Sequence, residues 1–288
     1  MLSARSSFVD SRLLRPPEQS QNPTIPHIIH QTFMTKDLPA ELRENVDLIK
    51  RLNPNWTHVL YDDADIYAFI SENYGSGILR YFERINPKYG VARADLFRYL
   101  LLYKKGGVYL DIKSTCTHPL DQLIRPEDKF ILSQWRNKPG EEHAGFGLSR
   151  EVAHVAGGEY QQWHIVAASG HPFLLAVIEA VLNNIDQYRP WLHGTGAIGV
   201  LRLTGPLAYT LAIQPLLLTA PHRYVCNETA MGLQYSIYQT PLHRAVYKLN
   251  YSSLTESIVK MKKTDQLPAY LYSVIKKSKN FLLNRKKH

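Results

Sequence analysis

The sequence predicts an α/β fold in which helices flank a mostly parallel sheet. Short apolar runs, typical of buried strands, alternate with longer segments whose apolar residues recur at helical spacing. This alternation is typical of parallel sheets, because two parallel strands need a crossover, usually a helix, to join them. A third observation is segment 93–113, where a helix, a Gly-Gly stop and a buried strand follow one another and the strand ends in a carboxylate.

The predicted elements follow in chain order from these patterns. In the first half we expect a strand within 25–33, a helix over 37–52, a strand over 56–61, a helix from 62 to 74, a helix over 91–104 and a strand over 108–112. In the second half we expect a strand over 130–133, a buried segment at 165–168, a helix from 172 to 181, a glycine-rich loop around 194–199 and a helix after 206.

The composition limits the class of protein. The 288 residues include 44% hydrophobic and 20% charged residues, which are typical of a soluble globular protein with an ample core. The sequence has no run of about 18 apolar residues, so no membrane-spanning helix is expected. The two cysteines, Cys116 and Cys226, do not make a disulfide framework and favour a reducing, cytoplasmic compartment.

The net charge of +9 is concentrated at the C-terminus, where residues 260–288 hold nine Lys or Arg and one Asp. We therefore expect a flexible leader over 1–24, a body over 25–255 and a basic amphipathic helix over 256–288. An apolar stripe beside lysines predicts a peripheral contact with the inner face of an anionic membrane. A solvated helix docked on the body is the alternative. No nucleic acid is expected, because the nearly neutral body lacks a basic face.

The chemistry is concentrated in residues 93–113. Asp95 and Arg98 are three residues apart, so they project from the same side of a helix. Strand side chains alternate, which places Asp111 and Lys113 on one face at the strand's C-terminal end, where open α/β sheets bind ligands. The simpler alternative is an ion pair on a helix surface followed by a tight turn. A buried strand that ends in charged residues favours a ligand-binding site, because charges near the interior are costly unless they have partners.

These motifs resemble glycosyltransferase family 32, the DXD-containing sugar-transferase family that includes fungal α-1,6-mannosyltransferases and bacterial capsule and lipopolysaccharide enzymes. The resemblance covers roughly residues 25–120 and rests on the opening strand at 25–31, on 53–54 and 61–63, and above all on 93–111. Segments 170–172 and 204–206 are weaker matches. The resemblance implies a GT-A-like fold, a UDP-sugar or GDP-sugar donor and retention of the anomeric configuration.

Site roles are carried over from the family by position. Asp95 is expected to hold hydroxyls of the donor sugar or ribose, and Arg98 to contact the sugar or its phosphate, with Tyr99 beside them. Phe33 lies where the family usually has Trp, so it is expected to stack on the base, and the backbone at Thr32 is expected to read the base edge.

Two further positions allow a functional and a structural interpretation. Asp62 and Asp63 follow a strand and could face the ribose, whereas Asp63 could instead cap the next helix. His171 stands directly before Pro172 at the predicted start of a helix, so packing or capping is its expected role.

One departure from the family pattern concerns the metal. The family shows Asp-x-Asp, whereas this chain has Asp111-Ile112-Lys113, and a lysine cannot ligate the Mn²⁺ or Mg²⁺ that hard oxygen ligands hold. In one arrangement the diphosphate, Asp111 and a later residue hold the metal; in another, Lys113 itself stabilises the leaving nucleotide. An inactive site is a third outcome. The later residues considered are His243, Asn250 and Ser252.

The sequence thus predicts a retaining glycosyltransferase that moves a hexose or N-acetylhexosamine from a UDP-sugar or GDP-sugar to a hydroxyl of a glycan or lipid-linked glycan. Its expected catalytic set is Asp95, Arg98, Asp111 and Lys113, with Asp111 as the metal ligand. Two alternatives remain open: a catalytically inactive membrane-associated scaffold, and a nucleic-acid-binding protein acting through residues 260–288.

Overall fold

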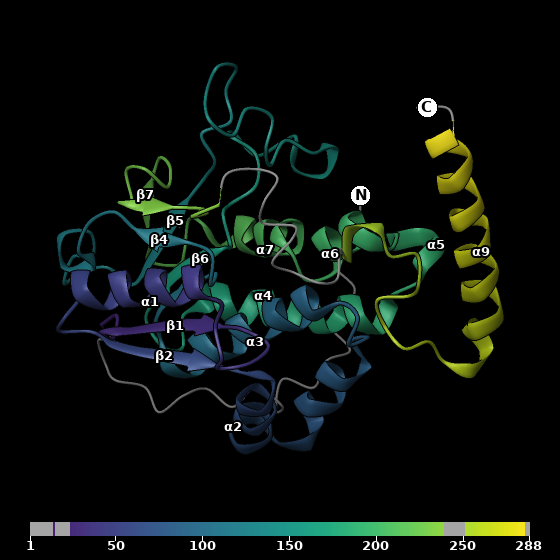
Figure 1. The fold of residues 1–288 in the computed structure, drawn as a ribbon, viewed down its shortest axis with the longest axis horizontal. Helices are drawn as coiled ribbons and strands as arrows, with labels where there is room; N and C mark the ends of the chain where they lie inside the picture. Colours follow the sequence, from purple (N-terminus) through teal and green to yellow (C-terminus); the bar gives the residue numbers. More distant parts are fainter. Residues whose placement is uncertain (1–13, 15–23, 239–250, 286–288) are drawn as a thin grey trace.

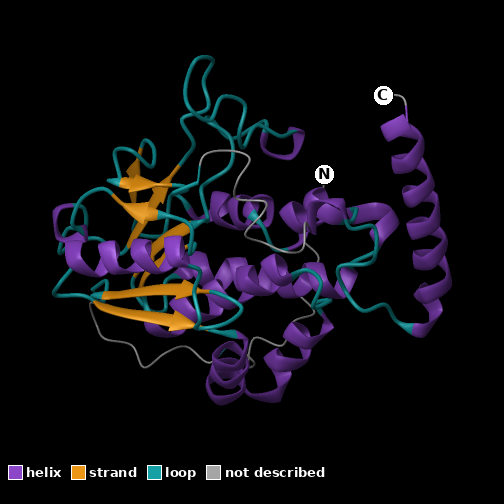
Figure 2. Cartoon of the chain, in the orientation of Figure 1, coloured by secondary structure: helices purple, strands orange, loops and turns teal. Residues whose placement is uncertain are grey.

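The computed structural model describes residue 14, residues 24–238 and residues 251–285. Most of the predicted leader over 1–24, together with His243 and Asn250, lies outside the described residues. Figure 1 shows a central sheet with helices packed against it and one helix, α9, standing at the far end of the molecule. In Figure 2 the strands gather on one side, and helices make up most of the rest.

The main sheet confirms the predicted α/β class. Its strand order is β2-β1-β3-β6-β5-β7, and a separate small sheet pairs β4 with β8. Neighbouring strands run parallel in the pairs β1–β2, β1–β3 and β5–β7, whereas β6 is antiparallel to both β3 and β5. The strands are β1 (Ile28–Thr32), β2 (Thr57–Tyr61), β3 (Gly107–Leu110), β4 (Thr115–Cys116), β5 (Phe130–Ser133), β6 (His164–Ala167), β7 (Arg223–Val225) and β8 (Leu233–Gln234).

Except at 190–193 and 196–203, the helices lie where the sequence pattern predicts them, with longer bounds in several cases. They are α1 (Ala40–Leu52), α2 (Asp63–Arg84), α3 (Gly90–Lys105), α4 (Pro172–Gln187), α5 (Pro190–His193), α6 (Gly196–Leu203), α7 (Pro206–Ile213) and α9 (Lys263–Arg285). Short 3-10 turns add Leu120–Gln122, Arg150–Val152, Gln214–Leu216 and Tyr251–Ser253.

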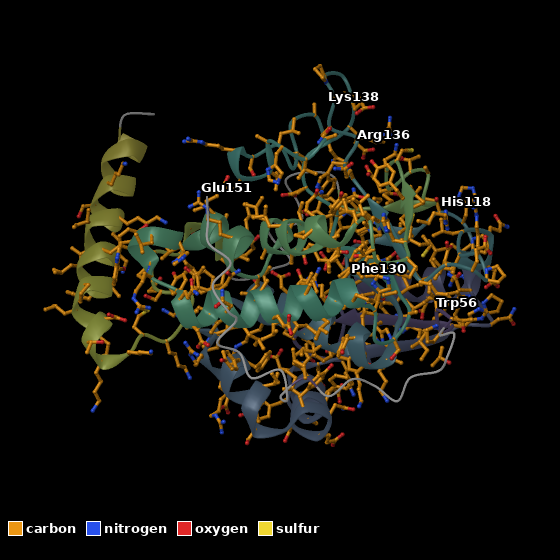
Figure 3. All side chains as sticks on the ribbon, turned by 180° about the vertical axis from the view of Figure 1, so that it is seen from behind. Trp56, His118, Phe130, Arg136, Lys138 and Glu151 are labelled. Carbon is orange, nitrogen blue, oxygen red and sulfur yellow. The ribbon has the colours of Figure 1, made fainter. Side chains whose placement is uncertain are left out.

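Each face of the sheet packs into its own core because strand side chains alternate. In β3, Tyr109 joins the core on the side of α2, α3, α4 and α7, whereas Val108 and Leu110 face the core that includes Ile49 of α1. In β5, Phe130 belongs to the first core and Ile131 to the second. Figure 3 shows Phe130 among densely packed side chains, and Lys138 at the tip of a protruding loop.

Helix α3 is enclosed on all sides over much of its length. Every residue from Asp95 to Tyr103 is buried, including two charged ones. A helix without a solvated face belongs to the interior of a protein. Charged side chains in α3 must therefore find partners inside the fold, or they would be costly to bury.

The predicted Gly-Gly stop joins α3 to β3. Gly106 has a φ of 65° and Gly107 a φ of 103°, conformations that favour glycine. A Cβ on Gly107 would lie 2.6 Å from the carbonyl oxygen of Ile28, and one on Gly106 would lie 2.7 Å from the amide of Ser169. The two glycines therefore allow β3 to enter the sheet directly after the helix.

Three element boundaries differ from the prediction. Helical structure continues beyond Tyr74 to Arg84, with a kink at Gly75 where φ is 70°. The predicted glycine-rich loop contains helix α6 instead, because Gly196 and Gly199 allow close packing: a Cβ on Gly196 would lie 2.5 Å from the carbonyl oxygen of Ser252. Strand β3 ends at Leu110 rather than at 112, since a turn follows it.

The C-terminal helix begins at Lys263, seven residues later than the predicted start at 256. Ile258 and Val259 are buried in the core, and Val259 forms an isolated bridge with Ile85. A helix is therefore present near the C-terminus, and the segment before it belongs to the packed body.

One described stretch, Gly196–Leu216, is long and apolar enough to cross a membrane by length and composition. It consists of α6, α7 and a short 3-10 turn, and most of it is buried within the protein. Burial of this kind is what the core helices of a folded domain show, so the finding is weak grounds for a membrane span.

Candidate active site

The structure brings together the three charged residues that the sequence singled out. Nη2 of Arg98 lies 3.2 Å from Oδ1 of Asp95, one helical turn away in α3. The same nitrogen lies 3.2 Å from Oδ1 of Asp111, directly after β3. The side chains of Asp95 and Arg98 are 1% and 5% exposed, whereas that of Asp111 is 25% exposed. The cluster therefore reaches solvent through Asp111.

Asp95 is anchored by neutral donors as well as by Arg98. The hydroxyl of Thr204 donates to its Oδ2 at 2.8 Å, and the amide of Gln162 donates to its Oδ1 at 3.2 Å. Burial raises the pKa of Asp95, and Arg98 together with these two donors opposes that shift. The donors fix the orientation of the carboxylate.

Arg98 is held by three further contacts. Its Nη1 donates to the backbone oxygen of Gln162 at 2.7 Å, and its guanidinium carbon lies 4.5 Å from the centre of the Tyr109 ring. Its Nε lies 3.5 Å from the carbonyl oxygen of Ala94. A guanidinium stacked on an aromatic ring and bonded on several sides has little freedom to move.

Asp111 begins a turn rather than ending a strand. Its amide donates to the carbonyl oxygen of Trp163, and its own carbonyl accepts from the amide of Ser114, both at 2.8 Å. The strand alternation that was expected to align Asp111 with Lys113 therefore does not apply. Instead, Nζ of Lys113 lies 3.8 Å from the centre of the Tyr235 ring. The predicted catalytic role of Lys113 stays a prediction.

Tyr99 lies behind the charged cluster. It is fully buried and stacks on Tyr209 with the ring centres 5.8 Å apart. Its hydroxyl lies 2.7 Å from the side-chain oxygen of Gln162 and 2.8 Å from the carbonyl oxygen of Thr204, and it can donate to either. This placement supports the residues that hold Asp95; the predicted contact between Tyr99 and the donor stays a prediction.

The residues predicted to hold the nucleotide base lie at the end of β1. The hydroxyl of Thr32 is 2.9 Å from that of Tyr109, which links Thr32 to the cluster. Phe33 is only 9% exposed and packs in a small core cluster with Leu38, Leu42, Val46 and Ile112. Stacking of Phe33 on a base stays a prediction, and most of its ring area is already covered by protein.

Asp62, rather than Asp63, caps the helix that follows β2. The Asp62 carboxylate accepts from the amide of Asp65 at 2.9 Å, and Asp65 accepts from the amide of Asp62 at 3.1 Å. This reciprocal pair is a capping box, a device that satisfies amides in the first turn of a helix. The predicted contact between Asp62 and the ribose is not tested by this arrangement.

Two residues that organise the cluster were missed in the sequence. Gln162 contacts Asp95, Arg98 and Tyr99 with three different atoms, and no local pattern marks a lone glutamine for that role. Thr204 lies in the weakly matching segment 204–206, which was the one available signal. Tyr251, which is partly buried, also senses these charges: burial first, and then the negative charge of Asp95, raise its pKa to about 12.

Two places among the described residues could hold a divalent cation. Asp111 offers Oδ2, which has no hydrogen-bond partner among the described residues and suits a cation that a diphosphate also ligates. Separately, the donor atoms of Glu142, His143 and Glu228 lie within 4.8 Å of one another. In that second group, Nε2 of His143 lies 3.3 Å from Oε1 of Glu228.

In this α/β fold the buried charged cluster lies at the C-terminal end of β3, in a mostly parallel sheet. Residues 39–131 match a family model described as the glycosyltransferase sugar-binding region containing the DXD motif. That range includes Asp95, Arg98 and Asp111. Over this region the chain is similar to the DXD-containing glycosyltransferases, in agreement with the resemblance found in its motifs.

Curated relatives are similar over a larger part of the chain. The mannosyl phosphorylinositol ceramide synthase SUR1 of Saccharomyces cerevisiae is 39% identical over 193 residues, covering 66% of this chain and 44% of that protein. Inositol phosphoceramide mannosyltransferase 3 of Schizosaccharomyces pombe is 31% identical over 191 residues, covering 65% and 44%. The initiation-specific alpha-1,6-mannosyltransferase of the same yeast is 27% identical, covering 67% and 49%. The matched region spans slightly less than half the length of these relatives.

Among solved structures, the PaToxG glycosyltransferase aligns with a TM-score of 0.47 at 16% identity, covering 68% of this chain and 71% of that one. The UDP-bound glycosyltransferase domain from the YGT toxin aligns with a TM-score of 0.42 at 9% identity, covering 72% and 80%.

Proposed function

We propose that the chain is a retaining glycosyltransferase that moves a hexose or N-acetylhexosamine from a UDP-sugar or GDP-sugar to an acceptor hydroxyl. The single observation that supports this most is the Asp95–Arg98–Asp111 cluster, in which a buried carboxylate and guanidinium are joined to a partly exposed carboxylate. The family match over residues 39–131 and the named mannosyltransferase relatives support a mannosyl residue as the first sugar to test.

In this proposal the cluster orients the donor. Asp95 accepts hydrogen bonds from sugar or ribose hydroxyls, and Arg98, held between the two carboxylates, donates to the sugar or to its phosphate. Preorganised groups of this kind contribute to catalysis because they need no reorganisation as charge develops in the transition state. The enclosure of α3 keeps both side chains fixed before the donor binds.

A diphosphate donor also needs positive charge, because Asp95, Arg98 and Asp111 together carry a net charge of −1. A Mn²⁺ or Mg²⁺ ion bound by Asp111 and the diphosphate would supply it and stabilise the departing phosphate. Lys113 is the other source. It stands two residues after Asp111 and against the Tyr235 ring, where a modest movement of a flexible side chain would bring its ammonium to the diphosphate.

We assign neither carboxylate as a covalent nucleophile, since Asp95 is 1% exposed and the free oxygen of Asp111 is the proposed cation ligand. We therefore propose that the acceptor hydroxyl attacks from the same face that the leaving diphosphate vacates, which retains the configuration.

The proposed acceptor is a hydroxyl of a glycan or of a lipid-linked glycan. The name of one relative includes phosphorylinositol ceramide and that of another includes inositol phosphoceramide, so a phosphoinositol lipid headgroup is the first acceptor to test. The proposed location is peripheral, on the cytoplasmic face of a membrane. The free cysteines Cys116 and Cys226 and the lysine-rich α9 support it.

The experiment measures release of UDP or GDP from purified protein with UDP-glucose, UDP-N-acetylglucosamine and GDP-mannose, each with and without Mn²⁺. We expect one donor to be hydrolysed, and turnover to rise when inositol phosphoceramide is added. Asp95→Asn should abolish the signal, whereas Asp186→Asn, in an ion pair with Arg84 away from the cluster, should keep it. Folded protein that hydrolyses no donor above background would overturn the proposal and favour the inactive scaffold.

The role of Lys113 has its own comparison. If the ammonium stabilises the leaving group, Lys113→Gln should lower kcat while KM changes little. Lys113→Arg, which keeps the positive charge, should restore part of the lost rate. Equal activity of all three proteins would assign the diphosphate charge to the metal alone.

A further inference from the structure

Helix α9 is attached to the body along one side. Nζ of Lys276 donates to the carbonyl and hydroxyl oxygens of Thr195, at 3.1 and 2.7 Å. Asp265 pairs with Arg189 at 3.2 Å, and Ala269 is buried. Positions 265, 269 and 276 are four and seven residues apart, so these contacts come from a single helical face.

The opposite face of α9 is apolar and exposed. Its stripe consists of Leu267, Tyr270, Leu271, Val274 and Ile275, which are between 42% and 67% exposed. Their spacing of three, four, seven and eight residues defines one face of a helix. At 100° per residue, the centre of this stripe lies about half a turn from the face that contacts the body. The stripe therefore points away from the protein.

Exposed lysines border this stripe. Lys277 lies beside Tyr270 and Val274 on one edge, Lys279 lies near the other edge, and Lys263 stands at the start of the helix. Helix α5, which contacts α9, adds the exposed side chains of Trp191 and Leu192.

We propose that α9 lies flat on an anionic lipid bilayer, with this apolar stripe in the boundary between headgroups and acyl chains. An amphipathic helix with lysines beside its apolar face is the usual structure for such binding, and anionic headgroups attract the lysines. A second copy of the chain fits less well, because two stripes facing each other would bring their flanking lysines together. This inference does not depend on the proposed enzymatic reaction, since binding is measured without a donor.

The experiment is co-sedimentation of the full chain with vesicles of phosphatidylcholine alone or with 30 mol% phosphatidylserine. We expect binding to the anionic vesicles, at least tenfold weaker binding to neutral ones, and loss of affinity as salt rises. Leu271→Glu/Ile275→Glu should weaken binding at least tenfold, and Lys277→Glu/Lys279→Glu should remove its salt dependence.

The matched control is Leu48→Glu/Leu218→Glu, which places two glutamates at exposed leucines outside α9 and should bind like the original protein. Circular dichroism and urea unfolding confirm that each variant is folded. Unchanged binding by Leu271→Glu/Ile275→Glu, or equal binding to both kinds of vesicle, would overturn the proposal. So would a dimer in analytical ultracentrifugation that the same double variant converts to a monomer, because the stripe would then contact a second copy.

Discussion

Arg98 holds Asp111 at 3.2 Å and thereby connects the interior of α3 to the first residue after β3. One end of this pair is buried, and the other is a quarter exposed. A ligand that reaches Asp111 therefore meets a carboxylate whose position is fixed from inside the protein, through Arg98 and, behind it, Asp95.

Replacing Arg98 by Lys keeps the charge but removes the planar fork that contacts both carboxylates. We expect donor turnover to fall at least tenfold, and the free energy of unfolding to fall by about 1–3 kcal/mol, because hydrogen bonds to buried groups are lost. Steady-state kinetics and urea unfolding measure the two effects. Arg202→Lys, in the more exposed pair with Glu151, is the control and should change neither. Turnover of Arg98→Lys within twofold of the original would contradict the assigned role.

Replacing Thr204 by Val keeps the shape of the side chain but removes the hydroxyl that donates to Asp95 at 2.8 Å. The carboxylate then loses a donor in a site without water access, which should destabilise the protein by about 1–3 kcal/mol. We also expect at least tenfold lower turnover, because the carboxylate is less well oriented. Thr204→Ser retains the hydroxyl and should retain most of the turnover. If the two variants have the same kinetics, the hydroxyl is not what positions Asp95.

The two candidate cation positions can be separated by a pair of variants. Asp111→Asn weakens a hard oxygen ligand and should raise the Mn²⁺ concentration needed for half-maximal donor hydrolysis at least tenfold. Glu228→Gln disrupts the group of Glu142, His143 and Glu228 and should leave that concentration unchanged. The reverse result would place the catalytic metal in the second group. Manganese titrations of both variants, followed by nucleotide release, make the comparison.

Stability should fall in mild acid, in part because of His171. Its Nε2 donates to the carbonyl oxygen of Pro221 at 2.9 Å, and its Nδ1 accepts from the amide of Phe173 at 3.2 Å, which caps α4 as the sequence predicted. Burial lowers the pKa of His171 to about 4. Between pH 6.5 and pH 4, His171 is therefore protonated in the unfolded chain but neutral in the folded protein. The free energy of unfolding falls as the pH is lowered through this range.

The variant His171→Asn isolates this effect, since asparagine also caps helices but does not titrate. Urea unfolding between pH 7 and pH 4.5 should show a slope smaller by up to about 1.4 kcal/mol per pH unit than that of the original protein. Other buried histidines such as His164 contribute in both proteins and cancel in the difference. Parallel slopes would show that His171 titrates normally.

Local patterns were sufficient to predict the strands β1 to β3, the helices between them and the clustering of Asp95, Arg98 and Asp111. Helical spacing places Asp95 and Arg98 on the same side of α3, and the parallel sheet fixes the edge at which β3 ends. Both predictions depend only on residues that are close together in the sequence. The partners of Asp95 could not be predicted in this way. Gln162 and Thr204 come from 67 and 109 residues further along the chain, and only the packed fold brings them to α3.

Glycine was the main source of the errors in element boundaries. The glycines around Gly196 were interpreted as a loop, yet Gly196 starts α6 and its amide bonds the hydroxyl of Tyr89 at 3.1 Å. At Gly75 the expected end of a helix is only a kink. Gly196 allows another part of the chain to approach closely, and Gly75 allows the helix backbone to bend. Neither role can be recognised from a single sequence.

The enclosure of α3 has a consequence for how this scaffold can diversify. A change of backbone position at Asp95 or Arg98 would disturb packing on every side of the helix at once, so these two residues hold a fixed position for any ligand that binds beside Asp111. New ligand preferences are then most readily acquired in exposed loop segments such as 138–149, where exchanges leave the buried core untouched.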